Sequence, residues 1–352
     1  MLSFVNDYSE GAHPKILERL NETNFEQLAG YGSDRYCEQA KEKIRAAIGC
    51  PEAEIFFLVG GTHTNQVVLD SLLRAYDGVI AAESGHVNVH EAGAIEHGGH
   101  KVLALGHTDG KLSAETVREY VETFYADGNY THMVFPGAVY ISHPTEYGTL
   151  YSKKELAAIS ALCREKRLPL YIDGARLAYA LACPENDVTL RDLAALCDIF
   201  YIGGTKCGAL LGEAVVIPQP GLIPHFFTII KQHGALLAKG RLLGIQFDTL
   251  FTDGLYERIG ADAVRYADAI RRAMAENGYL PCFPSPTNQS FCIVSEQQRK
   301  ELAERVDFSV WEQYDETHSI IRFATSWATR EEDVNALCRI LRECTAQEKA
   351  AS

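Results

Sequence analysis

Three short segments of the sequence carry residues whose types and spacing could do chemistry. In the first, an apolar run over 54–59 ends at Gly60 and Gly61, and Thr62-His63-Thr64-Asn65 follows. A strand that enters a helix through glycines leaves free backbone N–H groups at the positive end of the helix dipole, where phosphate binds readily. The segment has neither the phosphate-loop nor the dinucleotide spacing, so a glycine turn with a threonine cap is the structural alternative.

The second segment is Tyr171-Ile172-Asp173-Gly174-Ala175-Arg176. An acid at the carboxyl end of a parallel strand faces the crevice in which α/β proteins bind their ligands. The structural alternative is that Asp173 caps the following helix and pairs with Arg176.

The third segment is Ile202-Gly203-Gly204-Thr205-Lys206-Cys207-Gly208, in which a lysine follows a buried apolar strand. Desolvation lowers the pKa of a lysine, and the neutral amine can form a Schiff base with a carbonyl group. Taken by itself, a surface lysine after a strand is the commoner case.

Together the three segments fit one cofactor, pyridoxal 5′-phosphate (PLP). PLP needs an amine for its aldehyde, a carboxylate for its ring nitrogen and a phosphate site. Lys206 would supply the amine and Asp173 the carboxylate. Gly61 and Thr62 would hold the phosphate, and Thr205 can add its hydroxyl. Lys206 follows Asp173 by 33 residues, one strand–helix–strand unit, so both side chains can reach one crevice.

The elements that must position these residues alternate between strand and helix. Expected strands are 54–59, 79–81, 101–105, 133–142, 170–173, 199–202 and 214–217, with helices at 64–73 and 153–167. This alternation predicts an α/β fold with a mostly parallel sheet covered on both faces. After residue 246 come a helix over 261–277, strands at 291–294 and 320–323, and a helix over 331–344. We therefore predict a large domain over 1–246, including an N-terminal arm, and a smaller α+β domain over 247–352.

Composition narrows the class of protein. The 352 residues include 33 Lys and Arg against 47 Asp and Glu, a net charge of −14, which disfavours nucleic acids and membrane surfaces as partners. The ten cysteines are irregularly spaced and form no Cys-x-x-Cys pair, so zinc ribbons and redox motifs have no support. We see neither a signal peptide nor an apolar stretch long enough to span a bilayer, and expect a reduced, soluble, cytoplasmic protein.

From Asn6-Asp7 to Arg322, the chain resembles the threonine aldolase branch of the β-eliminating lyases, which are PLP enzymes of the aspartate aminotransferase fold (fold type I). The resemblance is carried by 60–65, 85–93, Asp-Gly-Ala-Arg at 173–176, Lys206 and Arg322. It implies active sites built between two subunits, and hence a homo-oligomer, with a homotetramer usual in the family.

The resemblance also implies roles for single residues. His86 would stack on the cofactor ring, and Arg322 would hold the substrate carboxylate with help from Arg176. Tyr31 belongs to a segment that would reach across a subunit interface. Lys239, or Arg241 after a one-residue shift, would lie near the phosphate.

Two departures from the family pattern concern the substrate. Glu146, in Thr145-Glu146-Tyr147-Gly148, replaces a family histidine that lies near the β-hydroxyl. A carboxylate could accept the hydroxyl proton if its pKa is raised or if a water relays the proton. Near the start, Val5-Asn6-Asp7 replaces Arg-Ser-Asp, and Asn6 can still donate to a carboxylate or a ring oxygen.

The resemblance implies a PLP-dependent carbon–carbon lyase that cleaves L-threonine, L-allo-threonine or related L-β-hydroxy-α-amino acids to glycine and an aldehyde. His86, Glu146 acting through a water, and a water held by the phosphate are the candidate bases. The alternatives are a PLP-dependent β-eliminating lyase or dehydratase, and a catalytically silent PLP-binding protein. We expect no metal, because His90-Glu91 begins a HExxH pattern that lacks its second histidine.

Overall fold

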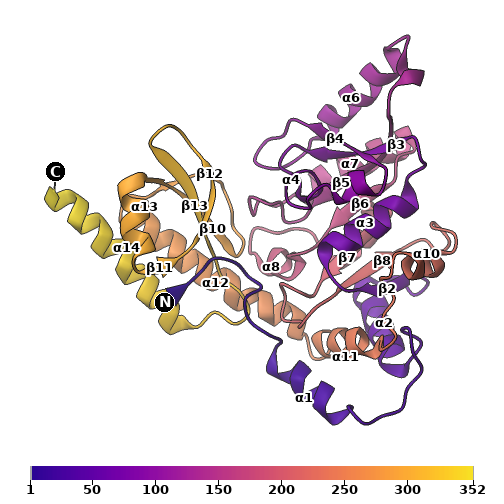
Figure 1. Cartoon of the computed structure of the whole chain (residues 1–352), viewed down its shortest axis with the longest axis horizontal. Coiled ribbons are helices and arrows are strands. Elements are labelled where there is room, and N and C mark those ends of the chain that lie inside the picture. Colours follow the sequence, from indigo (N-terminus) through magenta and orange to yellow (C-terminus); the bar gives the residue numbers. More distant parts are fainter. Residues whose placement is uncertain (1, 352) are drawn as a thin grey trace.

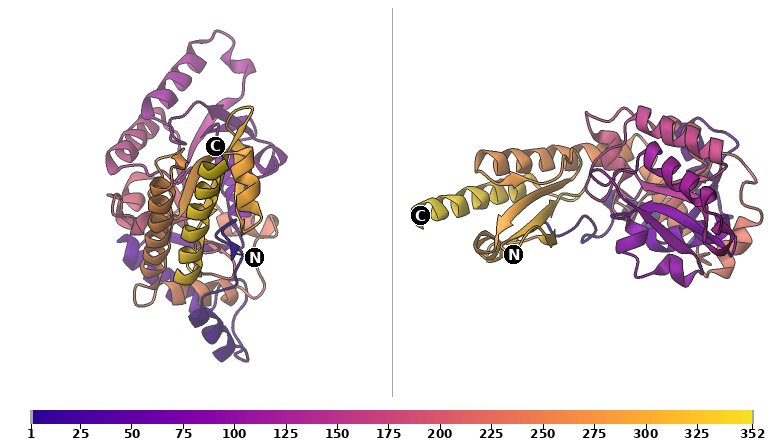
Figure 2. Two further views of the ribbon diagram at one scale, coloured as in Figure 1. Left: turned by 90° about the vertical axis from the view of Figure 1, so that its left-hand side faces the viewer. Right: turned by 90° about the horizontal axis from the view of Figure 1, so that it is seen from above.

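The computed structural model describes residues 2–351, with side chains described through residue 345. Two sheets organise the chain, a seven-stranded one in the larger part and a four-stranded one in the smaller part (Figure 1). The first and the last described residues both lie at the smaller part (Figures 1 and 2).

The large sheet has the strand order β2-β8-β7-β6-β5-β3-β4. Its strands are β2 (Glu54–Leu58), β3 (Asp77–Ala82), β4 (Lys101–Leu105), β5 (Phe135–Ser142), β6 (Leu170–Asp173), β7 (Ile199–Gly203) and β8 (Glu213–Ile217). β8 runs opposite to the other six strands, so its pairings with β2 and β7 are antiparallel and the other four pairings are parallel. The predicted mostly parallel sheet is therefore confirmed.

Helices cover both faces of this sheet. Successive residues of one strand enter different cores, as Tyr171 and Ile172 of β6 do, because side chains alternate across a strand. The helices before residue 251 are α1 (Pro14–Glu22), α2 (Arg35–Ile48), α3 (Gly61–Leu72), α4 (His86–Val89), α5 (Ala94–His97), α6 (Ala114–Ala126), α7 (Lys153–Lys166), α8 (Leu177–Ala182), α9 (Leu190–Leu196), α10 (Phe226–Gln232) and α11 (Arg241–Leu250), with a 3₁₀ turn at Tyr130–His132.

The smaller part combines an antiparallel sheet with three helices. The sheet has the order β12-β13-β10-β9. Its elements are β9 (Leu280–Pro281), β10 (Gln289–Ser295), β12 (Ser309–Gln313) and β13 (His318–Ala324), with helices α12 (Leu255–Glu276), α13 (Glu296–Ala303) and α14 (Glu331–Ala351). The N-terminal strand β1 (Leu2–Ser3) pairs with β11 (Val306–Asp307), and Phe4 packs into the smaller core.

Helix α12 belongs to both parts. Tyr256 and Ile259 in its first half pack into the core of the large sheet, whereas Ile270 and Met274 pack into the smaller core. It starts six residues before the predicted 261. Helix α11 runs across residue 246, and the domain boundary placed there stays a prediction.

All ten cysteines lie in the described part of the chain and are free thiols. Within residues 2–351, none of the helices combines the length and the apolar character that a bilayer-crossing segment requires.

Candidate active site

A cavity of about 320 Å³ opens where the strands of the large sheet end. Its lining contains Tyr8, Gly61, Thr62, His86, His90, Ser142, Pro144, Glu146, Asp173, Ala175, Arg176, Tyr201, Thr205, Lys206 and Glu213. All three segments singled out in the sequence thus meet in one place, as their positions at the ends of parallel strands predict.

Asp173 ends β6 and is 4% exposed. Its Oδ1 accepts hydrogen bonds from the Tyr201 hydroxyl at 2.6 Å and the Ala175 N–H at 3.0 Å. Its Oδ2 accepts from the Tyr140 hydroxyl at 2.7 Å and the Asn65 amide at 3.1 Å. Burial alone would raise the pKa of Asp173, but nearby His86 and the two hydroxyl donors outweigh it, so the pKa is lowered. The cavity therefore holds a fixed negative charge.

His86 begins the short helix α4 and lines the same cavity. Its Nδ1 lies 2.7 Å from Oε1 of buried Glu91, which also accepts from the Asn65 amide at 2.7 Å. The Asn65 amide therefore links Glu91, the partner of His86, to Asp173. This network fixes the orientation of the His86 ring.

Lys206 follows β7 and lines the cavity. Burial and the charge of Arg176 lower the pKa of Lys206, although nearby carboxylates oppose the shift. Its Nζ lies 5.9 Å from the centre of the Tyr8 ring. An amine with a lowered pKa is a better nucleophile near neutral pH.

The N-terminus of α3 meets the cavity at Gly61 and Thr62. A Cβ atom on Gly61 would lie 3.2 Å from the Tyr201 hydroxyl, so the absent side chain leaves room for a ligand. Thr205 lines the same cavity. The first N–H groups of a twelve-residue helix suit a phosphate at this position.

The structure does not place Lys239 or Arg241, the two cations expected near the phosphate, at the Gly61–Thr62 end of the cavity. Lys239 is exposed and is not among the cavity residues. Arg241 donates to the backbone carbonyls of Thr23, Asn24 and Glu26 and so stabilises the N-terminal arm.

Arg176 is in the cavity but already has a partner. Its Nε and Nη2 donate to the two oxygens of buried Asp7, at 2.6 and 3.0 Å. Asn288 donates to the same carboxylate at 2.9 Å. Burial would raise the pKa of Asp7, but the charges of Arg176 and Lys206 and these bonds lower it to about 2.

Arg322 lies in β13, opposite Ser309 of β12, and is not among the residues that line the cavity. Its Nη1 donates to the Gln289 side chain at 2.9 Å. Its Nη2 donates to the Val5 carbonyl at 2.9 Å and the Ser309 hydroxyl at 3.0 Å. The buried Nε has no acceptor, and burial and Arg176 lower the pKa of Arg322 to about 10.

Glu146 is buried in the loop after β5 and lines the cavity. Its Oε1 accepts from the Ser142 hydroxyl at 2.6 Å and from the backbone N–H of His86 at 2.9 Å. Burial raises its pKa. Its backbone carbonyl accepts from Gln289, the residue that also holds Arg322.

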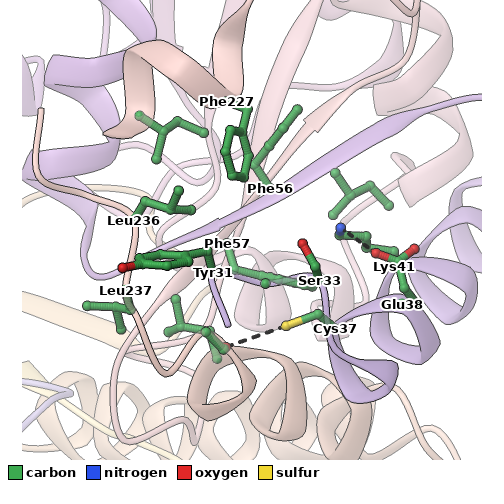
Figure 3. Close-up of a pocket in the computed structure, with 15 residues that line it drawn as sticks. Tyr31, Ser33, Cys37, Glu38, Lys41, Phe56, Phe57, Phe227, Leu236 and Leu237 are labelled. Carbon is green, nitrogen blue, oxygen red and sulfur yellow. Dashed lines mark hydrogen bonds and ion pairs between the residues drawn. The ribbon is translucent and has the colours of Figure 1, made fainter. Parts of the chain in front are cut away.

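Asn6 and Tyr31 lie outside the cavity lining. The Asn6 side-chain oxygen accepts from the Tyr8 N–H and the Ser9 hydroxyl, which shapes the N-terminal turn. Tyr31 is 43% exposed and lines a separate, largely apolar pocket of about 290 Å³. In Figure 3 its ring lies beside Leu236 and Leu237.

Sequence reasoning missed several residues of the site: Asp7, Tyr8, Tyr140, Tyr201 and Glu213. Glu213 left a usable signal, because an acid that begins the otherwise apolar run 213–217 needs a buried partner. Asp7 lies in the segment 5–7 that carries the family resemblance, but nothing local indicates its partner Arg176, which is 169 residues away.

The cavity fits PLP. It joins an amine of lowered pKa, an ionised carboxylate and a helix N-terminus with a glycine cradle, the three groups that this cofactor requires. Among the described side chains, no three His, Cys, Asp or Glu residues are arranged to hold a metal ion.

The family profile described as beta-eliminating lyase matches residues 8–304. The chain is also 32% identical over 346 residues to a low specificity L-threonine aldolase from a Pseudomonas species, with 96% of each chain covered. The chain belongs to the β-eliminating lyase family.

Solved structures agree with this family assignment. A threonine aldolase from Leishmania major superposes with a TM-score of 0.95 at 42% identity, covering 98% of this chain and all of that one. An aspartate aminotransferase from Thermus thermophilus superposes with a TM-score of 0.73 at 16% identity, covering 98% and 91% of the two chains. The second match shows the fold, and the predicted aspartate aminotransferase-like fold is confirmed. Like the rest of this family, the chain is a lyase that uses PLP.

Proposed function

We propose that this protein is an aldolase that cleaves L-threonine, L-allo-threonine or a related L-β-hydroxy-α-amino acid to glycine and an aldehyde. The observation that carries the proposal is the joint placement of Lys206, Asp173 and His86 in one cavity, in a chain 32% identical to an L-threonine aldolase over nearly its whole length.

Each cavity group has a proposed task toward the cofactor. Lys206 would supply the amine that holds it, and Asp173 would keep a proton on its ring nitrogen. His86 would lie against its ring, while Gly61, Thr62 and Thr205 would hold its phosphate. When bound, the cofactor would supply a protonated ring able to accept the electron pair of the breaking Cα–Cβ bond.

A second group of residues orients the substrate. Arg322, with Arg176 and Asn6, binds its carboxylate, and the unused Nε of Arg322 supports this role. Glu146, through a water, or His86 removes the β-hydroxyl proton. The raised pKa of Glu146 supports it as a base near neutral pH.

We further propose that the protein is a cytoplasmic homotetramer in which a second copy completes the site with Tyr31 and Lys239. The exposure of Tyr31 and Lys239 and their absence from their own chain's cavity support this arrangement. Ten free thiols suit a reducing compartment.

The test is to incubate PLP-loaded protein with each substrate and to measure acetaldehyde and glycine together. Equimolar products that are lost in Lys206→Ala would support the aldolase. A keto acid and ammonia would instead favour the β-eliminating alternative, and bound PLP with no product from any β-substituted amino acid would favour a silent binding protein.

A further inference from the structure

The cavity contains a second buried acid to which the proposed function gives no task. Glu213 is 3% exposed and begins β8. Because β8 is antiparallel, its first residue lies at the same sheet edge as the last residue of β7, and Glu213 pairs with Gly203. Glu213 therefore lines the cavity together with Lys206.

Glu213 contacts the turn that carries Lys206. Its Oε2 accepts from the Gly204 N–H at 2.9 Å. In the same turn the Thr205 hydroxyl accepts from the Gly212 N–H at 3.0 Å. One oxygen of this carboxyl is thus held two residues before the lysine, and the turn itself is tied to Gly212, the residue before Glu213.

The ionisation of the two groups is linked. Burial raises the pKa of Glu213 to about 7, against the hydrogen bonds from Thr205 and Gly204 and the charge of Lys206. Burial and Arg176 lower the pKa of Lys206, against the carboxylates Asp7, Asp173 and Glu213. The two pKa values are therefore drawn toward each other.

Other charged and titratable groups face this pair from the N-terminal segment, α4, the loop after β5, β6 and β7; they are Asp7, Tyr8, His86, His90, Glu146, Asp173, Arg176 and Tyr201. Of the three carboxylates that act on Lys206, Asp7 and Asp173 have lowered pKa values and hold no proton near neutrality. Of these three carboxylates, Glu213 is therefore the group that can accept a proton near neutral pH.

We propose that Glu213 takes up, through a water in the cavity, the proton that Lys206 gives up on becoming nucleophilic. An N–H bond of the ammonium breaks and its electron pair stays on Nζ, the water relays the proton, and an O–H bond forms on Glu213. An ammonium and a carboxylate thus become an amine and a carboxylic acid, which removes two buried charges without changing the net charge. This inference rests on the proposed role of Lys206 as the reactive amine.

The test uses cofactor-free protein and no amino acid substrate. Covalent capture of PLP at Lys206 is followed from pH 5 to 10 by borohydride trapping and mass spectrometry of the Lys206 peptide. Glu213→Gln keeps an oxygen that can accept from Gly204 but has neither a charge nor a titratable proton. We expect the pH profile of capture by the wild type to show two ionisations. The profile of Glu213→Gln should show a single ionisation, at a lower pH than the upper ionisation of the wild type. Glu213→Asp should restore a profile with two ionisations.

The matched control is Glu54→Gln, which makes the same change on β2, opposite Ile217 at the far end of β8. It should leave the capture profile unchanged. An identical profile in Glu213→Gln and wild type would overturn the proposal. Failure to form acetaldehyde from either substrate would overturn only the proposed aldolase activity, because capture needs no substrate.

A second readout does not depend on capture. A carboxyl whose pKa is raised on folding stabilises the folded state below its unfolded pKa, and this stabilisation is lost as pH rises through the folded value. For Glu213 that window runs from 4.5 to about 7. The Tm of cofactor-free Glu213→Gln relative to wild type should therefore rise from pH 5 to pH 8. A constant difference would contradict the raised pKa and with it the proposal.

Discussion

The two ends of the proposed site, at Asp173 and at Arg322, each bury a charge, but they stabilise it differently. The anion of Asp173 accepts four hydrogen bonds, all from neutral donors on the large sheet or beside it. The cation of Arg322 has only neutral acceptors, and its Nε has none. An isolated buried charge is costly. Each end is therefore suited to an opposite charge from a bound molecule: a protonated ring nitrogen at Asp173 and a carboxylate at Arg322.

The two ends also differ in how they are built. The partners of Asp173 belong to β5, β7, α3 and the residues after β6, within one half of the molecule. The partners of Arg322 come from β10, β12 and the N-terminal segment at Val5, and its ring neighbour Trp311 lies 4.7 Å away. The Asp173 end is set by one sheet, whereas the Arg322 end depends on three segments remaining together.

The largest effect is expected from Asp173→Asn. This change keeps the shape of the side chain but removes the charge that we propose holds a proton on the cofactor ring. We expect kcat for L-threonine to fall by about 100-fold or more, in the range seen when one preorganised group that stabilises developing charge is removed. Steady-state acetaldehyde release measures it.

Cofactor absorbance and thermal unfolding provide the controls for Asp173→Asn, because the variant should still fold and bind PLP. A kcat within threefold of wild type would mean that the charge at Asp173 is not needed, and the contrast between the two ends would lose its basis.

The Asp173 end could be predicted from sequence because its parts are local. Asp173 ends a strand, Lys206 follows one closely, and Gly61 and Thr62 begin a helix after one, so neighbouring residues alone place them at one sheet edge. The fold could be predicted for the same reason, since each expected strand is confirmed within about two residues and the helix 153–167 ends one residue early.

The surroundings of Arg322 could not be predicted from local sequence patterns. The resemblance indicated Arg322 itself, but its acceptors Gln289 and Ser309 come from separate strands, and Val5 is 317 residues away. The pair of Asp7 and Arg176 is equally remote in sequence. Ser309 and Gln289 are also common polar residues whose types indicate no partner, so only the packing of the smaller sheet reveals them.

Arg322→Lys tests the second end and should have an intermediate effect. Lysine keeps the charge but cannot bind a carboxylate with two parallel N–H bonds. A hydrogen bond to a charged group contributes about 1.5–3 kcal/mol, so we expect KM for L-threonine to rise about 10- to 150-fold with a smaller change in kcat.

Arg271→Lys is the matched control for Arg322→Lys. Arg271 is a half-buried arginine of the smaller part, and it donates to the carbonyls of Pro286 and Thr287. Its replacement should lower the Tm without raising KM. An equal rise of KM in both variants would show that the effect on binding is only a consequence of lost stability.

The smallest effect is expected from Ser309→Ala. The Ser309 hydroxyl donates to the Val5 carbonyl at 2.6 Å while accepting from Arg322, so it links the N-terminal segment to the arginine. Its loss should cost about 1 kcal/mol, which corresponds to a KM about fivefold higher. Ser295→Ala, which removes the cap of α13 in the same part, should lower the Tm by a similar amount and leave KM unchanged. If Ser309→Ala lowered the Tm but not the affinity for substrate, the Arg322 end would be as rigidly preset as the Asp173 end, and the difference between them would lie in charge alone.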